Sequence, residues 1–179
     1  MLKSKNIYLR QLKISDANEL LDLLKKNQSF FEKYSINRPT NYWTIETQKE
    51  LIEKWEQNAK QDTEYQFGIY KSDDNSLIGS ISLFHVARGP RHSAMVGYHL
   101  DQEHNGKGYT TEATKLIVNY AFEILHLHRI EAGVMPHNIG SIKVLEKAGF
   151  LKEGIAKKNI KINGRWEDHQ MLAIINPKE

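Results

Sequence analysis

The stretch Asp101–Ala113, DQEHNGKGYTTEA, contains two glycines separated by one residue, Gly106 and Gly108. Before it, Ser93–Leu100 (SAMVGYHL) is apolar and rich in residues that favour strands, whereas after it apolar residues recur at helical spacing as far as Ile124. A glycine turn that opens a helix presents free backbone N–H groups and the positive end of the helix dipole. The stretch therefore predicts a binding site for a phosphate or a diphosphate.

Two familiar phosphate-binding patterns do not fit these residues. A P-loop needs glycine where Asp101 stands and a hydroxyl residue where Gly108 follows Lys107. A dinucleotide fingerprint needs glycine or alanine in the place of Thr111. An ordinary turn that requires positive φ before a helix remains an alternative for the two glycines alone.

A second segment shows what kind of fold surrounds the turn. Leu127–Met135 (LHRIEAGVM) has the composition of a strand, and Pro136 ends it. The residues that follow predict a helix over Asn138–Phe150, with Asn138 as its N-cap and Gly149 just past its end. The predicted order is strand, glycine turn, helix, strand and helix.

With this order, the chain resembles the GNAT superfamily of N-acetyltransferases. The diphosphate loop of that family reads Gln/Arg-x-x-Gly-x-Gly/Ala, and Glu103 replaces its first residue here. The other matching positions of the loop and of the following helix are Gly106, Gly108, Asn138, Ser141, Gly149 and Phe150. Residues 97–113 (GYHLDQEHNGKGYTTEA) and the tail INGRWEDHQMLAII look most like the ribosomal-protein-alanine N-acetyltransferase (RimJ/RimL-like) branch, and this resemblance spans roughly residues 7–175.

The resemblance implies an α/β (α+β) GNAT fold. Its central mixed, mostly antiparallel sheet should have about seven strands, splayed between strands 4 and 5 and flanked by helices. The expected strands are Ile7–Leu12, Tyr65–Tyr70, Leu77–Phe84, Ser93–Leu100, Leu127–Met135, Leu151–Ile162 and Trp166–Asn176. We expect further helices from Ser15 or Asp16 through Leu24 and over Thr44–Lys60, and a tight hairpin turn at Asn163-Gly164. Residues 1–179 should form a single N-acetyltransferase domain.

Composition narrows the function classes. The chain has no cysteine, which excludes disulfides, thiolate zinc sites and a cysteine nucleophile, and fits a reducing cytoplasm. No apolar run approaches the roughly eighteen residues of a membrane span, and the N-terminus lacks an apolar signal core. A net charge of +3 gives no support for direct binding of nucleic acid. We therefore expect a cytoplasmic protein without a membrane partner or a metal, and a homo-oligomer stays possible.

One basic run lies near the C-terminus. It consists of Lys152, Lys157, Lys158, Lys161 and Arg165. A solvated strand face accounts for it, and a docking surface for something acidic, such as a ribosomal particle, is the alternative.

The resemblance implies acetyl-CoA as the cosubstrate. Its diphosphate would accept hydrogen bonds from main-chain N–H groups between His104 and Tyr109, each contributing about 1.5–3 kcal/mol. The edge of the strand that ends at Leu100 would receive the thioester and the pantetheine arm. By resemblance, the cofactor-binding residues are Tyr98, His99, Leu100, His104, Asn105, Gly106, Lys107, Gly108, Tyr109, Asn138 and Ser141.

Two of these residues also have catalytic roles by resemblance. Asn138 would bond the pantetheine arm, and the Ser141 hydroxyl would donate to the leaving thiolate, whose ordinary pKa is about 8.5. The ribosomal-protein branch has a carboxylate base on the strand before the Asn-Gly turn, where this chain has Ile160. The other candidates for the base are Asp168, Glu167, Glu153, Glu112 and His99.

The sequence leaves three functions open. The first is acetyl transfer to the N-terminal α-amine of a protein, possibly a ribosomal one, with Phe30–Trp43 contributing to the acceptor pocket. The second is acetylation of a small amine, such as a polyamine, an antibiotic or an amino-acid derivative. The third is a non-catalytic CoA-binding module, which the isoleucine at position 160 suggests.

Overall fold

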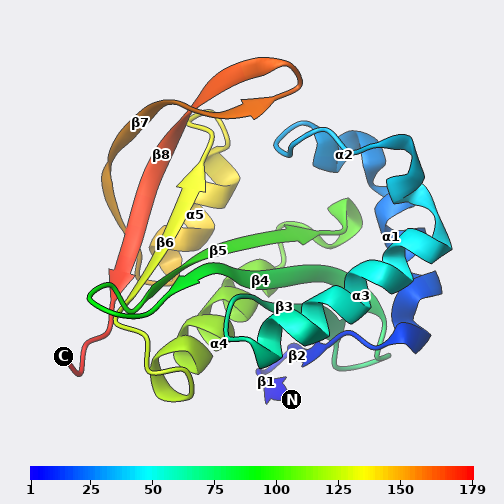
Figure 1. Ribbon diagram of the computed structural model, residues 1–179, viewed down its shortest axis with the longest axis horizontal. Helices are drawn as coiled ribbons and strands as arrows, with labels where there is room; N and C mark the ends of the chain where they lie inside the picture. The colour runs from blue at the N-terminus through cyan, green and yellow to red at the C-terminus, as the bar shows by residue number, and fades with distance from the viewer.

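The computed structural model describes residues 1–179, and one mixed sheet of eight strands organises it (Figure 1). The strands are β1 (Leu2–Lys3), β2 (Ile7–Gln11), β3 (Tyr65–Lys71), β4 (Leu77–Ala87), β5 (Ser93–Leu100), β6 (Arg129–Val134), β7 (Leu151–Ile162) and β8 (Arg165–Ile175). Their order across the sheet is β1-β2-β3-β4-β5-β6-β8-β7, and only the β5–β6 pair is parallel. The predicted mixed, mostly antiparallel sheet is confirmed, with β1 as the strand beyond the seven expected.

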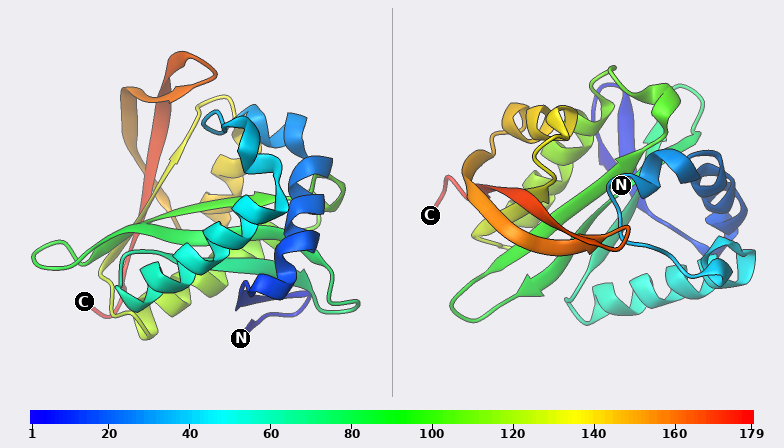
Figure 2. Two further views of the ribbon diagram at one scale, coloured as in Figure 1. Left: turned by 45° about the vertical axis from the view of Figure 1, so that its right-hand side comes forward. Right: turned by 90° about the horizontal axis from the view of Figure 1, so that it is seen from above.

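The helices cover both faces of this sheet (Figure 2). They are α1 (Ala17–Lys26), α2 (Gln28–Glu32), α3 (Ile45–Lys60), α4 (Tyr109–Glu123) and α5 (Ile139–Lys147). The larger core cluster joins the sheet to α4 and α5, and the smaller one packs α1 and α3 against the opposite face. None of these helices combines the length and the apolar character that a membrane span requires.

The splay lies between β5 and β6, which are strands 4 and 5 of the predicted sheet. These two strands pair only from Ser93 to Met95 with Arg129 to Glu131. Beyond Met95, β5 continues to pair with β4, and β6 continues to pair with β8. Figure 1 shows β6 and β8 rising away from the plane of β5. The main chain of β5 from Val96 onward therefore has a free edge facing the gap.

The β7–β8 hairpin has the turn that the sequence predicted. Asn163 and Gly164 both have positive φ, 50° and 80°, as a two-residue turn of the primed type requires. At this tip the Asn163 side-chain amide donates a hydrogen bond of 3.0 Å to the main-chain oxygen of Glu32 in α2. The hairpin and α2 are thus joined although they lie far apart in the sequence.

α1 begins after Asp16, one of the two residues expected at its start, but without a side-chain cap. Asp16 stands at the N-cap position, but its carboxylate makes no hydrogen bond to the first turn of the helix. It accepts instead from the Lys13 main-chain N–H at 2.7 Å and from two guanidinium nitrogens of Arg10 at 2.8 and 2.9 Å. Asp16 therefore fastens the end of β2 to the start of α1.

Candidate active site

A cleft of about 520 Å³ opens where β5 leaves β6. The glycine turn before α4, the first half of α5 and the segment around α2 form its walls. The predicted cofactor residues that line it are Tyr98, His99, Leu100, His104, Asn105, Gly106, Gly108, Tyr109, Asn138 and Ser141. Lys107 is exposed and does not line the cleft. Residues predicted from two distant motifs therefore converge on one space.

The glycine turn has the geometry of an anion site. Gly106 and Gly108 have φ of 79° and 82°, which residues with a Cβ adopt only with strain. Gly108 is the N-cap of the fifteen-residue helix α4, and no side chain caps that helix. A Cβ at either glycine would meet no atom within 4 Å, so the space beside the turn is open to a ligand. The N–H groups of the first turn are available to a diphosphate.

Lys26 forms a salt bridge with Glu103, the residue that stands where the family has Gln or Arg. Its ammonium lies 2.8 Å from a carboxylate oxygen of Asp101 and 2.8 Å from one of Glu103. Burial raises the pKa of Asp101, but hydrogen bonds from Lys26 and from the Glu103 main-chain N–H outweigh it and hold the pKa below its usual value. Both carboxylates next to the glycine turn are therefore compensated by one cation.

Ser141 lies between two groups that fix its position. The Asn138 side-chain oxygen accepts from the Ser141 main-chain N–H at 3.4 Å, which caps α5 and leaves the Asn138 amide nitrogen for other partners. The Tyr98 hydroxyl lies 2.7 Å from the Ser141 hydroxyl. Burial raises the pKa of Tyr98 to about 12, so this phenol is protonated at neutral pH.

His99 is the one predicted base that lines the cleft. Its ring packs on Phe31 with centroids 4.5 Å apart, and its Nε2 lies 3.0 Å from the Ser80 hydroxyl. Its Nδ1 is buried without a hydrogen-bond partner. Burial lowers the pKa of His99 to about 4, so its imidazole is neutral and only weakly basic.

The carboxylates predicted as candidate bases lie outside the cleft. Glu112 accepts hydrogen bonds from Ser4 and Asn6 and so holds the turn between β1 and β2. On the β7–β8 hairpin and beside it, Glu153 pairs with Arg129, Asp168 with Lys157, and Glu167 with Arg165. Ile160 lies on β7 opposite Glu167 and is 38% exposed. Each of these acids is paired with a residue outside the cleft, so none of them lies beside the predicted cofactor residues.

Some lining residues were not predicted from the sequence. On the α5 side they are Gly140, Lys143, Val144 and Lys147. Gly140, Val144 and Lys147 follow one another at steps of four and three residues and so share one face of α5, which is the signal that would have identified them. Around α2 the lining residues are Phe30, Phe31, Tyr34 and Ser35. Of the predicted acceptor segment Phe30–Trp43, only this first part lines the cleft, whereas Tyr42 and Trp43 pack against the cluster under α1 and α3.

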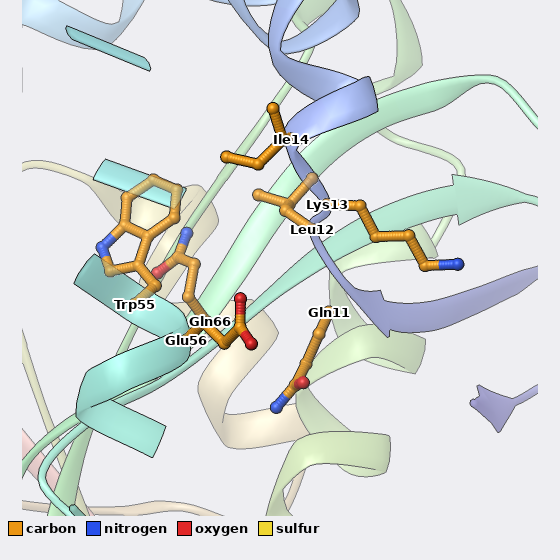
Figure 3. Close-up of a pocket in the computed structure, with 7 residues that line it drawn as sticks. All are labelled: Gln11, Leu12, Lys13, Ile14, Trp55, Glu56 and Gln66. Carbon is orange, nitrogen blue, oxygen red and sulfur yellow. The ribbon is translucent and has the colours of Figure 1, made fainter. Parts of the chain in front are cut away.

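A second hollow, of about 290 Å³, lies at the end of β2 beside α3 (Figure 3). Figure 3 shows Trp55 and Glu56 on the α3 side and Gln11 and Lys13 on the β2 side. None of the predicted site residues lines it. The structure also contains no group of three or more His, Asp or Glu side chains arranged to hold a metal ion.

Comparison with known proteins places this geometry in a family. The sequence matches the acetyltransferase (GNAT) domain over residues 6–151. The probable N-acetyltransferase YjcK of Bacillus subtilis is 55% identical over 179 residues, which cover 100% of this chain and 99% of that protein. The structure of ribosomal-protein-S5-alanine acetyltransferase from Vibrio fischeri matches with a TM-score of 0.92 and 32% identity, covering 98% of this chain and 96% of that one.

A further structural relative was solved with a coenzyme A derivative bound. Mycobacterium smegmatis RimJ, solved in complex with CoA-disulfide, has a TM-score of 0.91 and 26% identity, covering 96% of this chain and 83% of that one. The family match covers most of this chain, and its relatives are enzymes, so the non-catalytic module is not supported. The chain belongs to the GNAT acetyltransferases and is an acetyl-CoA-dependent N-acetyltransferase.

Proposed function

We propose that this N-acetyltransferase acetylates the N-terminal α-amine of a protein, and that this protein is ribosomal. The observation that carries the proposal is the state of the predicted bases. The His99 imidazole in the cleft has a pKa of about 4, and the candidate carboxylates are held elsewhere. Such a site suits an amine that loses its proton readily.

The ordinary pKa values of amines show how large this difference is. An α-amine of pKa about 7.8 is roughly one-third neutral at pH 7.5, whereas a lysine of pKa about 10.4 is about 0.1% neutral. Deprotonating a lysine would cost about 4 kcal/mol, and an α-amine less than 1 kcal/mol. Water can therefore take the proton of an α-amine without a strong base nearby.

The cleft residues supply the remaining requirements of acetyl transfer. The glycine turn would hold the diphosphate, and the free edge of β5 at Tyr98–Leu100 would hold the pantetheine arm and the thioester. The neutral amine attacks the acetyl carbon and the C–N bond forms, the nitrogen gives up its extra proton to water, and the C–S bond breaks with its electron pair on sulfur. The Ser141 hydroxyl donates a hydrogen bond to that sulfur, which makes it a better leaving group.

The acceptor would enter from the side of α2. Phe30, Phe31 and Tyr34 form an aromatic wall there, and the contact between Asn163 and Glu32 joins the hairpin tip to the same segment. The ribosomal acceptor is favoured by the enzyme from Vibrio fischeri, whose stated acceptor is ribosomal protein S5.

Mass spectrometry of protein N-termini, with and without the gene, tests this proposal. We expect one or a few ribosomal proteins to lose N-terminal acetylation in the deletion strain and to be acetylated by the purified enzyme. The rate with a matching peptide should rise with pH through an inflection near 8. Acetylation of lysine side chains or of a small polyamine, with all protein N-termini unchanged, would overturn the proposed acceptor.

A further inference from the structure

Two hydroxyl groups from separate elements meet in the lining of the cleft. Tyr98 extends from β5 and Ser141 from the first turn of α5, and their oxygens lie 2.7 Å apart. The Tyr98 oxygen is also 3.2 Å from the main-chain oxygen of Ser141. The resemblance to the family implied a role for the Tyr98 segment only through the edge of its strand, so the side chain of Tyr98 has no assigned part in the reaction.

The hydrogens of this pair can be arranged in two ways. In the first, Tyr98 donates to the Ser141 main-chain oxygen and Ser141 donates to Tyr98. In the second, Tyr98 donates to the Ser141 hydroxyl oxygen, and the Ser141 hydrogen is free. Only the second arrangement lets Ser141 donate to another acceptor, because each hydroxyl carries a single hydrogen.

We propose that Tyr98 is a positioning residue that donates to the Ser141 hydroxyl and so directs the Ser141 hydrogen toward the thioester sulfur. This inference rests on the proposed role of Ser141 as hydrogen-bond donor to the leaving thiolate. Negative charge on sulfur selects the second arrangement, since it accepts the hydrogen that Ser141 presents. A donor chain of two hydroxyls strengthens each bond in it, so Ser141 stabilises the thiolate better than it would alone.

The surroundings of the pair support this role. Burial raises the pKa of Tyr98 to about 12, so its phenol remains a donor at neutral and mildly alkaline pH. The Tyr98 ring is carried by a strand that pairs with β4 along its length, which fixes its direction. The Asn138 side chain holds the Ser141 main chain from the other side. Because the two oxygens already lie 2.7 Å apart, neither hydroxyl has to move far for the two hydrogen bonds to form in sequence.

Kinetics of three variants test whether the two hydroxyls act as one unit. Tyr98→Phe removes one oxygen and keeps the ring, and we expect it to lower kcat about five- to tenfold with the KM for acetyl-CoA changed less than about twofold. Ser141→Ala should lower kcat at least as much. The double variant should be no slower than Ser141→Ala, because Tyr98 acts only through Ser141. Multiplying losses in the double variant would overturn the proposal.

A matched control separates this effect from the general loss of a half-buried hydroxyl. Tyr120 in α4 packs its ring on Tyr65 and Phe67, away from the cleft. Tyr120→Phe should keep wild-type kcat. Thermal unfolding of all variants shows whether Tyr98→Phe is folded. A loss of kcat in Tyr98→Phe no larger than that in Tyr120→Phe would also overturn the proposal.

A titration without any acceptor separates this inference from the proposed function. The ultraviolet absorbance of the thiolate, measured as a difference from the free enzyme, reports the pKa of the thiol in bound CoA. We expect this pKa to rise by roughly half a unit to one unit in Tyr98→Phe, and no further in the double variant than in Ser141→Ala. An unchanged thiol pKa in Tyr98→Phe would refute the positioning role, even if protein N-termini are acetylated. A raised pKa would support it, even if the acceptor is a different amine.

Discussion

At the scale of single residues, Gly108 has a backbone conformation that favours glycine and lies at the proposed diphosphate site. Its φ of 82° disfavours any side chain, and the space beside it is open. We expect Gly108→Ala to weaken acetyl-CoA binding about tenfold, because the left-handed conformation costs about 1–2 kcal/mol. Gly108→Asp adds a negative charge where the diphosphate would lie and should abolish binding measurable by calorimetry.

Gly89 provides the matched control for that series. It also has positive φ, 62°, and a Cβ on it would meet no atom within 4 Å, but it lies in the loop between β4 and β5 outside the cleft. Gly89→Ala should cost stability and leave the affinity for acetyl-CoA unchanged. Equal affinities for wild type and Gly108→Asp would show that the diphosphate binds elsewhere.

Lys26 carries a second prediction at this scale. It contacts both Asp101 and Glu103, so Lys26→Met leaves two uncompensated carboxylates next to the glycine turn. We expect the dissociation constant of acetyl-CoA to rise about threefold at low salt, and less at high salt because exposed charges are screened. Adding Glu103→Gln to Lys26→Met should restore much of the affinity, since one negative charge is removed. An effect that is independent of salt would indicate a packing defect instead.

At the scale of elements, the sequence predicted turns and caps that neighbouring residues determine, and it missed contacts between residues far apart in the sequence. The glycine turn, the Asn138 cap and the Asn163-Gly164 hairpin depend on neighbouring residues, and the structure has all three. β1 was missed because two residues are too few to show alternation. Ser4 and Asn6 donate hydrogen bonds to Glu112 although they lie more than a hundred positions away in the sequence, and no local pattern predicts such contacts.

The bridge between the hairpin and α2 gives the prediction at this scale. The Asn163 side chain donates to the Glu32 main-chain oxygen at 3.0 Å. Asn163→Gly keeps a residue suited to positive φ and removes the bridge. We expect faster hydrogen exchange in α2, a raised KM for the acceptor and an unchanged KM for acetyl-CoA. Asn163→Asp is the companion variant, because it also tolerates this turn but cannot donate. Unchanged exchange in both variants would show that the bridge does not hold α2.

At the scale of the whole molecule, the sheet consists of two parts with a narrow junction. β1 to β5 form one part, and β6, β8 and β7 form the other. Three residue pairs between β5 and β6 join them along the sheet, and α4 and α5 pack beneath the junction. The cleft lies at the divergence, with β5 on one side and, on the other, α5, the helix that follows β6 in the chain. A ligand in it would contact β5 and α5 at once and would have no such site in the unfolded chain.

Acetyl-CoA should therefore raise the melting temperature of the whole protein in one transition. At a concentration one hundred times its dissociation constant, a ligand that binds only the folded state adds about 2.7 kcal/mol to the free energy of unfolding. For a chain of this size that corresponds to a rise of about 5–10 °C. Calorimetry should show this shift in wild type and in Tyr98→Phe, and no shift in Gly108→Asp. Two separate transitions, of which only one moves with acetyl-CoA, would mean that the two parts of the sheet unfold independently and that the ligand does not join them.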